Sequence, residues 1–196
     1  MTVPTIVYLH GFNSGPQSVK GRLLAAAAAT LAQPPVFHLP QLSHRPSRAM
    51  RDVRSWLDVH VPGGCGLTLV GSSLGGYYAT WLAERYGARA VLINPALRPY
   101  EDLRSYLGRQ RNPYDGEEYE FTAAHLDEMR SLAVTAITRP ERYFLLVRTG
   151  DELLDWRESV TYYAGASQYA LGGGDHGWTD FGDELAQVLR FAGCNA

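Results

Sequence analysis

The sequence LTLVGSSLGG at residues 67–76 decides the fold. Its first four residues are apolar or β-branched and predict a short buried strand, and a helical pattern begins after the last glycine. Between them stands a G-x-S-x-G motif, with Ser73 between Gly71 and Gly75. In so tight a turn, side chains at both glycine positions would collide with neighbouring backbone. The motif therefore predicts an exposed Ser73 hydroxyl at the tip of the turn, the alternative being a loop that needs glycine for its shape alone.

Short apolar strands alternate with helical segments along the chain. The predicted strands are residues 6–9, 36–39, 67–70, 90–93, 143–147 and 167–171. Further helices are predicted at 18–31, 47–60, 122–132 and 180–191, the second of them with Ser47 as its N-cap. This alternation predicts a single α/β domain over residues 1–196, with a mostly parallel sheet of about six strands and helices on both faces. Functional side chains are then expected at the carboxyl edge of the sheet.

The interval between the fourth and fifth predicted strands is far longer than one crossover needs. We interpret residues 95–139 as a small lid inserted into the domain. The segment is rich in tyrosine and arginine, so its aromatic rings could wall an acyl pocket and its arginines could meet a phosphate. The simpler interpretation, in which the rings pack the insertion onto the sheet and the arginines face water, is favoured.

The composition is that of an ordinary globular protein, with 45% hydrophobic and 19% charged residues among 196. A net charge of −2 gives no basic face and argues against a nucleic-acid partner. No run approaches 18 apolar residues and no signal-peptide pattern opens the chain, so we expect no membrane span and a cytoplasmic protein. Cys65 and Cys194 are interpreted as reduced thiols. No metal-ligand spacing such as H-E-x-x-H occurs, and no metal or other cofactor is expected.

A serine hydroxyl needs a base within hydrogen-bond reach to act as a nucleophile. We assign the base to His176, which lies in a glycine-rich loop after the sixth predicted strand. The carboxylate that orients it is expected at the end of the fifth strand, where Asp151 is nearest. Asp155 is the alternative acid, although it is better placed to cap the next helix, and Glu152 is expected to point away. The chain order Ser73, Asp151, His176 is the order found in α/β-hydrolases.

The turn after the first strand, His10-Gly11-Phe12, supplies a further part. Its position predicts that the backbone N–H groups of Phe12 and Leu74 hold the oxyanion of a tetrahedral intermediate. Gly11 is expected to allow the close turn, and His10 to brace the loop instead of acting as the base. No role is assigned to the remaining histidines, His38, His44, His60 and His125.

Residues 8–16 (YLHGFNSGP) and 71–83 (GSSLGGYYATWLA) resemble the small bacterial YqiA-like esterases of the α/β-hydrolase superfamily. The resemblance extends in register over nearly the whole chain, through residues 93–96, 112–114, 149–152 and 173–176. It implies the α/β-hydrolase fold, acyl esters or acyl-CoA thioesters as substrates, and a triad at Ser73, Asp151 and His176.

We therefore expect a serine hydrolase that cleaves small-molecule acyl esters or thioesters through an acyl-serine intermediate. Two alternatives stay open: a ligand receptor that keeps the fold but turns over slowly, and an acyltransferase whose acceptor is not water. A nucleotide-binding module is the least favoured, because residues 71–76 lack both the P-loop lysine and the G-x-G-x-x-G spacing.

Overall fold

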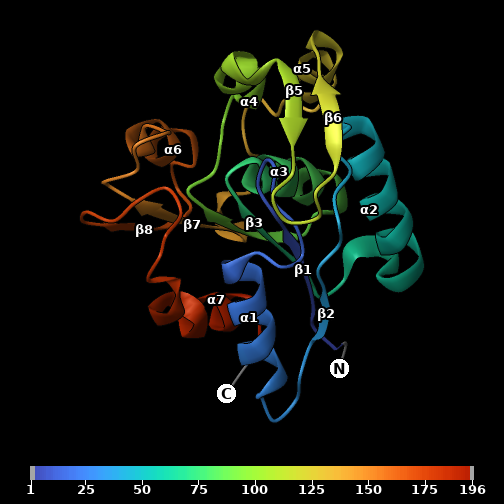
Figure 1. Ribbon diagram of the computed structural model, residues 1–196. Coiled ribbons are helices and arrows are strands. Elements are labelled where there is room, and N and C mark those ends of the chain that lie inside the picture. The colour runs from blue at the N-terminus through green and yellow to red at the C-terminus, as the bar shows by residue number, and fades with distance from the viewer. Residues whose placement is uncertain (1–2, 195–196) are drawn as a thin grey trace.

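A six-stranded parallel sheet forms the centre of the computed structural model, which describes residues 3–194 (Figure 1). Residues 1–2 and 195–196, which the predicted domain includes, lie outside this range. The strand order is β2-β1-β3-β4-β7-β8. The strands are β1 Thr5–Leu9, β2 Val36–His38, β3 Leu67–Ser72, β4 Arg89–Ile93, β7 Tyr143–Arg148 and β8 Ser167–Leu171. The predicted α/β class and six-stranded sheet are thus confirmed.

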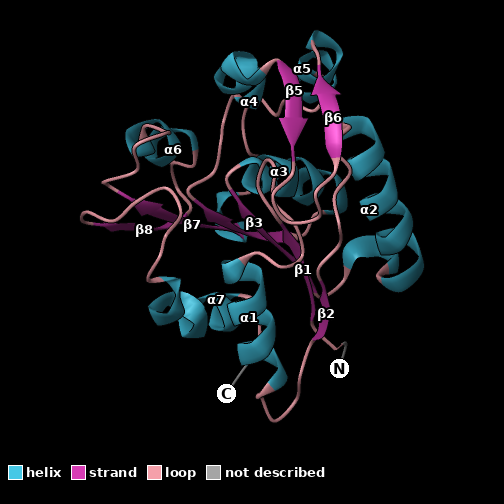
Figure 2. Ribbon diagram, in the orientation of Figure 1, coloured by secondary structure: helices cyan, strands magenta, loops and turns pink. Residues whose placement is uncertain are grey.

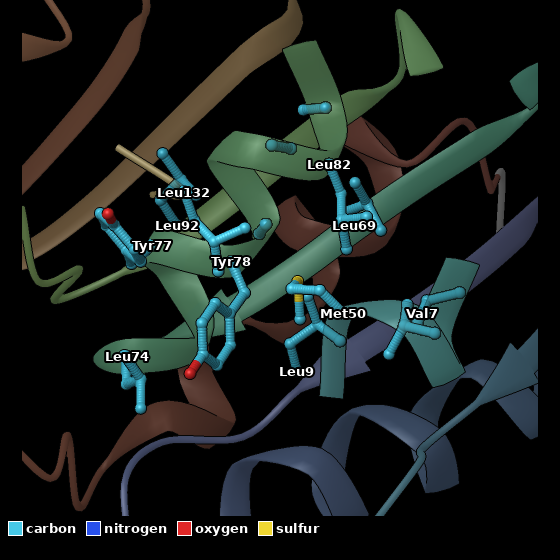
Figure 3. Close-up of a cluster of buried hydrophobic side chains, with 14 of the residues drawn as sticks. Val7, Leu9, Met50, Leu69, Leu74, Tyr77, Tyr78, Leu82, Leu92 and Leu132 are labelled. Atoms are coloured by element: carbon cyan, nitrogen blue, oxygen red, sulfur yellow. The ribbon is translucent and has the colours of Figure 1, made fainter. Parts of the chain in front are cut away.

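Helices cover both faces of the sheet (Figure 2). On one face α1 and α7 pack on side chains such as Ile6 and Tyr8 of β1, and on the other α2 and α3 pack on Val7 and Leu9. Figure 3 shows part of the second layer, where Met50 of α2 lies beside Leu9. Because both faces are covered, the central strands are apolar throughout instead of alternating. The α-helices are α1 Val19–Ala29, α2 Pro46–His60, α3 Leu74–Tyr86, α4 Pro99–Asp102, α5 Ala123–Arg130, α6 Trp156–Tyr162 and α7 Leu185–Phe191.

The strand order changes direction between β1 and β3. The chain leaves β1 for β2 on one side and returns to β3 on the other, and β1 and β3 then pair in parallel with Leu9 opposite Gly71. The loops that follow these two strands diverge and leave a crevice at their carboxyl ends, where ligands of open α/β sheets bind. Ser73 follows β3 directly at this point.

Two helix boundaries differ from expectation. The prediction of Ser47 as N-cap of α2 is wrong: the helix begins at Pro46, with Arg45 in the cap position. Proline suits the first helical turn because it lacks an N–H that would go unpaired there, and the Ser47 N–H donates instead to the Glu128 carboxylate at 3.0 Å. The last predicted helix is divided into a 3₁₀-helix, Phe181–Glu184, and α7.

The segment between β4 and β7 contains α4, α5 and an antiparallel hairpin of β5 Gly108–Arg111 and β6 Glu118–Phe121 (Figure 1). Three further 3₁₀-helices lie at Pro62–Gly64, Leu103–Tyr106 and Pro140–Arg142. The hairpin was not predicted, because its strands expose most of their side chains and carry no apolar run. That residues 95–139 act as a lid stays a prediction. Within the described chain no helix has the length and apolar character needed to cross a bilayer.

Candidate active site

Ser73 occupies the tight turn between β3 and α3. Its backbone has φ 56° and ψ −123°, a conformation that costs a non-glycine residue of the order of 1–3 kcal/mol. The Ser73 N–H donates to the Ile93 carbonyl at 3.0 Å. A Cβ on Gly75 would collide with the Leu9 carbonyl, and one on Gly71 with the Gly75 carbonyl. Both glycines are therefore required by close backbone approach, as the motif predicts.

The structure brings Ser73, His176 and Asp151 into one hydrogen-bonded chain. His176 Nε2 lies 2.9 Å from Ser73 Oγ, and His176 Nδ1 lies 2.8 Å from Asp151 Oδ2. A carboxylate only accepts hydrogen bonds, so the imidazole proton is on Nδ1 and the Nε2 lone pair faces the serine. The Asp151 side chain is 2% exposed, and its other oxygen accepts from the N–H groups of Leu153 and Leu154, both at 2.9 Å.

The charge state of Asp151 follows from these contacts. Burial raises its pKa, but the hydrogen bonds from His176 and from the two backbone N–H groups outweigh that cost, and the pKa lies below its usual range. Asp151 is therefore ionised at neutral pH, as a group that orients an imidazole and stabilises its protonated form must be.

The two neighbouring carboxylates have other contacts. Asp155 caps α6, and its side chain accepts from the Arg157 N–H at 2.9 Å. The expectation that Glu152 points away is wrong, because its Oε2 accepts the His176 backbone N–H at 3.0 Å. That expectation assumed strand-like alternation, but β7 ends at Arg148 and the chain then turns.

Asn94 is a site residue that the motif analysis did not assign. It follows β4 with φ 41° and is 3% exposed. Its amide donates to the carbonyl oxygens of Asp175 at 3.2 Å and His176 at 3.1 Å, while its oxygen accepts the Arg148 N–H at 2.9 Å. One side chain thus joins the ends of β4 and β7 to the loop that carries His176. The sequence signal that could have pointed to Asn94 is its place as a polar residue directly after an apolar strand.

The turn after β1 approaches Ser73 from the other side. Phe12 and Leu74 both line a pocket with Ser73 and His176, and Leu74 is the first residue of α3, where an N–H has no acceptor inside the helix. A Cβ on Gly11 would make an ordinary 3.4 Å contact with Ser73 Cβ. Glycine is therefore not needed there for a strained turn; it leaves space beside the serine.

Side chains of the β5–β6 hairpin and its turn hold this same loop. Asn13, at φ 49°, accepts a 2.6 Å hydrogen bond from the Tyr119 hydroxyl and donates to Gln110 Oε1 at 3.1 Å. The Asn112 amide donates to the Ser14 carbonyl at 3.0 Å. We call these three hydrogen bonds the hairpin clamp.

His10 makes the contacts of a brace. It is 4% exposed, its Nε2 accepts the Leu42 N–H at 3.1 Å, and its Nδ1 lies 3.0 Å from the Gly11 carbonyl. Burial lowers its pKa, which favours the uncharged ring that these contacts require. His10 therefore ties the loop after β1 to the segment after β2.

The pocket beside Ser73 has an arm of about 220 Å³ that is lined mostly by apolar side chains, together with Asp102 and Ser105; we call it the apolar arm. The insertion contributes part of its wall through Pro99, Leu103 and Tyr106. None of the insertion's arginines lines this arm; they are largely exposed, and Arg98 pairs with Glu158 at 2.6 Å. The arginines thus face water, as the simpler interpretation expects. At least one aromatic ring of the insertion, that of Tyr106, lines the pocket instead of only packing the insertion onto the sheet.

Comparison with known proteins places the chain in a family. Residues 5–193 match the profile of the Uncharacterised protein family (UPF0227). The chain belongs to this family. The resemblance to YqiA-like proteins is thereby confirmed.

Solved structures similar to this UPF0227 chain share its fold. A protein from Agrobacterium vitis S4 is 21% identical, with a TM-score of 0.73 over 97% of this chain and 88% of its own. The α/β-hydrolase domain-containing protein 10 from mouse is 17% identical, with a TM-score of 0.68 over 96% and 90%. Est1E from Butyrivibrio proteoclasticus, solved with ferulic acid bound, is 11% identical, with a TM-score of 0.69 over 96% and 87%. These similarities show the α/β-hydrolase fold.

The histidines left without a role in this UPF0227 chain make structural contacts. His44 Nδ1 lies 3.1 Å from His125 Nε2. His38 and His60 both stack on Trp56, at ring-centroid distances of 4.0 and 4.3 Å. Over residues 3–194 no three His, Cys, Asp or Glu side chains are grouped to hold a metal ion.

Proposed function

We propose that this protein is a serine hydrolase that cleaves acyl esters through an acyl-serine intermediate. The observation that carries the proposal is the chain Ser73 Oγ–His176 Nε2 at 2.9 Å and His176 Nδ1–Asp151 Oδ2 at 2.8 Å. Nucleophile, base and orienting carboxylate are in hydrogen-bond reach without any rearrangement. An esterase domain from Rhodothermus marinus has a similar fold and supports the same reaction class.

The reaction begins when Ser73 Oγ attacks the acyl carbonyl and its proton passes to His176 Nε2. Asp151 stabilises the imidazolium through Nδ1–H. The carbonyl oxygen becomes an oxyanion, for which the N–H groups of Phe12 and Leu74 are the donors, each worth about 3 kcal/mol of transition-state stabilisation. His176 then protonates the leaving alcohol or thiol as its bond to the acyl carbon breaks.

Water completes the cycle. His176 takes a proton from the water that attacks the acyl-serine, and returns a proton to Ser73 Oγ as the carboxylic acid leaves. The cycle consumes the ester and one water, releases the alcohol or thiol and the carboxylic acid, and returns Ser73 and His176 to their starting states.

The substrate we propose is a small ester with a short acyl chain. The apolar arm, at about 220 Å³, is below the 300–1,000 Å³ typical of sites for drug-sized ligands. Its wall includes Leu74 and Leu154 from the sheet domain and Leu103 from the insertion. An acyl group of a few carbons placed there would bring its carbonyl next to Ser73.

The test is a panel of p-nitrophenyl esters and acyl-CoAs of graded length, run on wild type, Ser73→Ala and Ser72→Ala. We expect Ser73→Ala to lower kcat by about 10⁴–10⁶-fold and Ser72→Ala to lower it less than about threefold. Equal losses in the two variants would contradict the assignment. Labelling of Ser73 by a fluorophosphonate with no turnover of any ester would instead indicate a ligand receptor.

A further inference from the structure

A second arm of the pocket, of about 460 Å³, opens beside Ser73 and His176. Lys20, near the start of α1, lines this arm together with Ser18, Asn13 and Tyr114. It is the single lysine of the sequence, and no arginine lines either arm. We call this region the Lys20 arm.

Lys20 is held toward the reacting groups. Its Nζ donates to the carbonyl oxygen of Gly177, the residue directly after His176. An ammonium group has three N–H donors, so this contact leaves others available. The Ser18 hydroxyl, in a residue 8% exposed, interacts with the Tyr8 hydroxyl. Lys20 therefore retains donor capacity toward this arm.

The carboxylates nearest to Lys20 have partners of their own. Asp151 is bonded to His176 and to two backbone N–H groups, and Asp175 accepts from the Thr179 hydroxyl at 2.8 Å. Across residues 3–194 no carboxylate oxygen forms an ion pair with Lys20, and Asp175 and Asp151 attract the ammonium group from a greater distance.

We propose that the Lys20 arm binds an anionic oxygen group, a carboxylate or a phosphate, on the alcohol or thiol portion of the substrate, with Lys20 determining this specificity. This inference rests on the proposed hydrolase function. The apolar arm suits the acyl chain, which leaves the Lys20 arm for the leaving group. Lys20 also contacts the His176 loop, and His176 is the group that protonates the leaving oxygen or sulfur.

The charge on Lys20 limits the pH range over which the protein is expected to prefer anionic leaving groups. Burial lowers its pKa to about 8, against the attraction of Asp175 and Asp151, which raises it. His176, Tyr8, Tyr106 and Tyr114 are the other titratable groups of this arm. A lysine is charged below its pKa, so the preference for anions is expected at pH 7 and should decline as the pH rises through about 8.

Two esters of matched size test the proposal: 4-carboxyphenyl butyrate, whose leaving group is anionic, and 4-carbamoylphenyl butyrate, whose leaving group is neutral. The quantity measured is the ratio of their kcat/KM values at pH 7. We expect wild type to favour the anionic ester, Lys20→Met to lower the ratio about tenfold, and Lys20→Arg to restore most of it. Arg22→Met is the control, because Arg22 is exposed on the same helix outside the pocket.

An equal loss with both esters in Lys20→Met would overturn the proposal and leave Lys20 with the single task of holding the His176 loop. Calorimetric titration of the Ser73→Ala variant with the same compounds separates this inference from the hydrolase function. Tighter, Lys20-dependent binding of the anionic compound, with no hydrolysis by wild type, would support the anion site and reject the hydrolase. Hydrolysis of both esters with equal efficiency by wild type would support the hydrolase function and reject the anion site.

Discussion

Two loops flank Ser73, and they are held by different parts of the molecule. The loop of residues 172–178, which carries His176, is tied to the ends of β4 and β7 through Asn94, and its Gly174 carbonyl packs so closely on Gly150 that a Cβ there would collide with it. The loop of residues 10–14 is tied to the insertion through the hairpin clamp, in addition to the His10 contact with Leu42. The loop that carries His176 is therefore held by the sheet, whereas the loop that carries Phe12 is held in part by the insertion.

This contrast changes the interpretation of the insertion. A freely opening lid would have few bonds to the site below it. Here Phe12 packs edge-on against Phe121 with ring centroids 5.2 Å apart, in addition to the three hydrogen bonds of the clamp. We propose that the hairpin positions Phe12, one of the two oxyanion donors, while residues 99–106 shape the apolar arm.

The largest expected loss of kcat follows from a change in the Asp151–His176 pair, which transfers the proton in the proposed mechanism. Asp151→Asn presents an N–H where His176 needs an acceptor, which favours the wrong imidazole tautomer, and kcat should fall by about 10⁴-fold. Asp155→Asn is the matched control, because asparagine still caps α6, and its kcat should stay within about twofold of wild type. Steady-state ester hydrolysis measures both, and similar losses of kcat in the two variants would contradict the assignment of the orienting acid to Asp151.

A smaller effect is expected where the sheet holds the His176 loop. Asn94→Ala leaves the carbonyls of Asp175 and His176 and the Arg148 N–H without this partner. Because displacing a catalytic group by about 1 Å can cost on the order of 10²-fold, we expect kcat to fall by about 10–100-fold with little change in KM.

Asn94→Asp sharpens the test, because it keeps the acceptor for the Arg148 N–H and replaces the two donors by a carboxylate oxygen that faces the carbonyls of Asp175 and His176. Circular dichroism at the assay temperature would verify that both variants are folded. A folded Asn94→Asp variant with wild-type kcat would show that the amide donors do not position His176.

The smallest effect is expected at the clamp. Tyr119→Phe removes one hydrogen bond to Asn13, a loss of about 1 kcal/mol, and should lower kcat about fivefold while KM changes little. Tyr86→Phe is the control, because that hydroxyl bonds Asp58 on α2, away from the pocket. If the two variants have the same kcat, the oxyanion loop is fixed without the insertion and the contrast between the two loops fails.

The predictable parts of the molecule are those fixed by local pattern. The structure has the last strand at residues 167–171, as the alternation of strands and helices predicts. The positions of Gly71 and Gly75 follow from steric demand within one motif. The hairpin escaped prediction because polar residues fill β5 and β6, so no apolar period marks them.

The contacts of Asn94 and Glu152 could not be predicted for a different reason. Both side chains bind backbone groups of a loop more than 20 residues away, at His176 and its neighbour. Any residue has such backbone groups, so no pattern of side-chain types marks the partner. The proximity of Ser73, Asp151 and His176 could be predicted, because the chemistry proposed for them restricts their residue types and their order.

The dependence of Asn13 on the insertion has an evolutionary consequence. A segment that only roofs a pocket can be swapped between relatives as an independent cassette to change substrate range. Here such an exchange would also remove the Tyr119 and Gln110 partners of Asn13, so the incoming cassette must bring replacements for them. In this chain, an exchange that changes the wall of the pocket would therefore also change how the Phe12 loop is held.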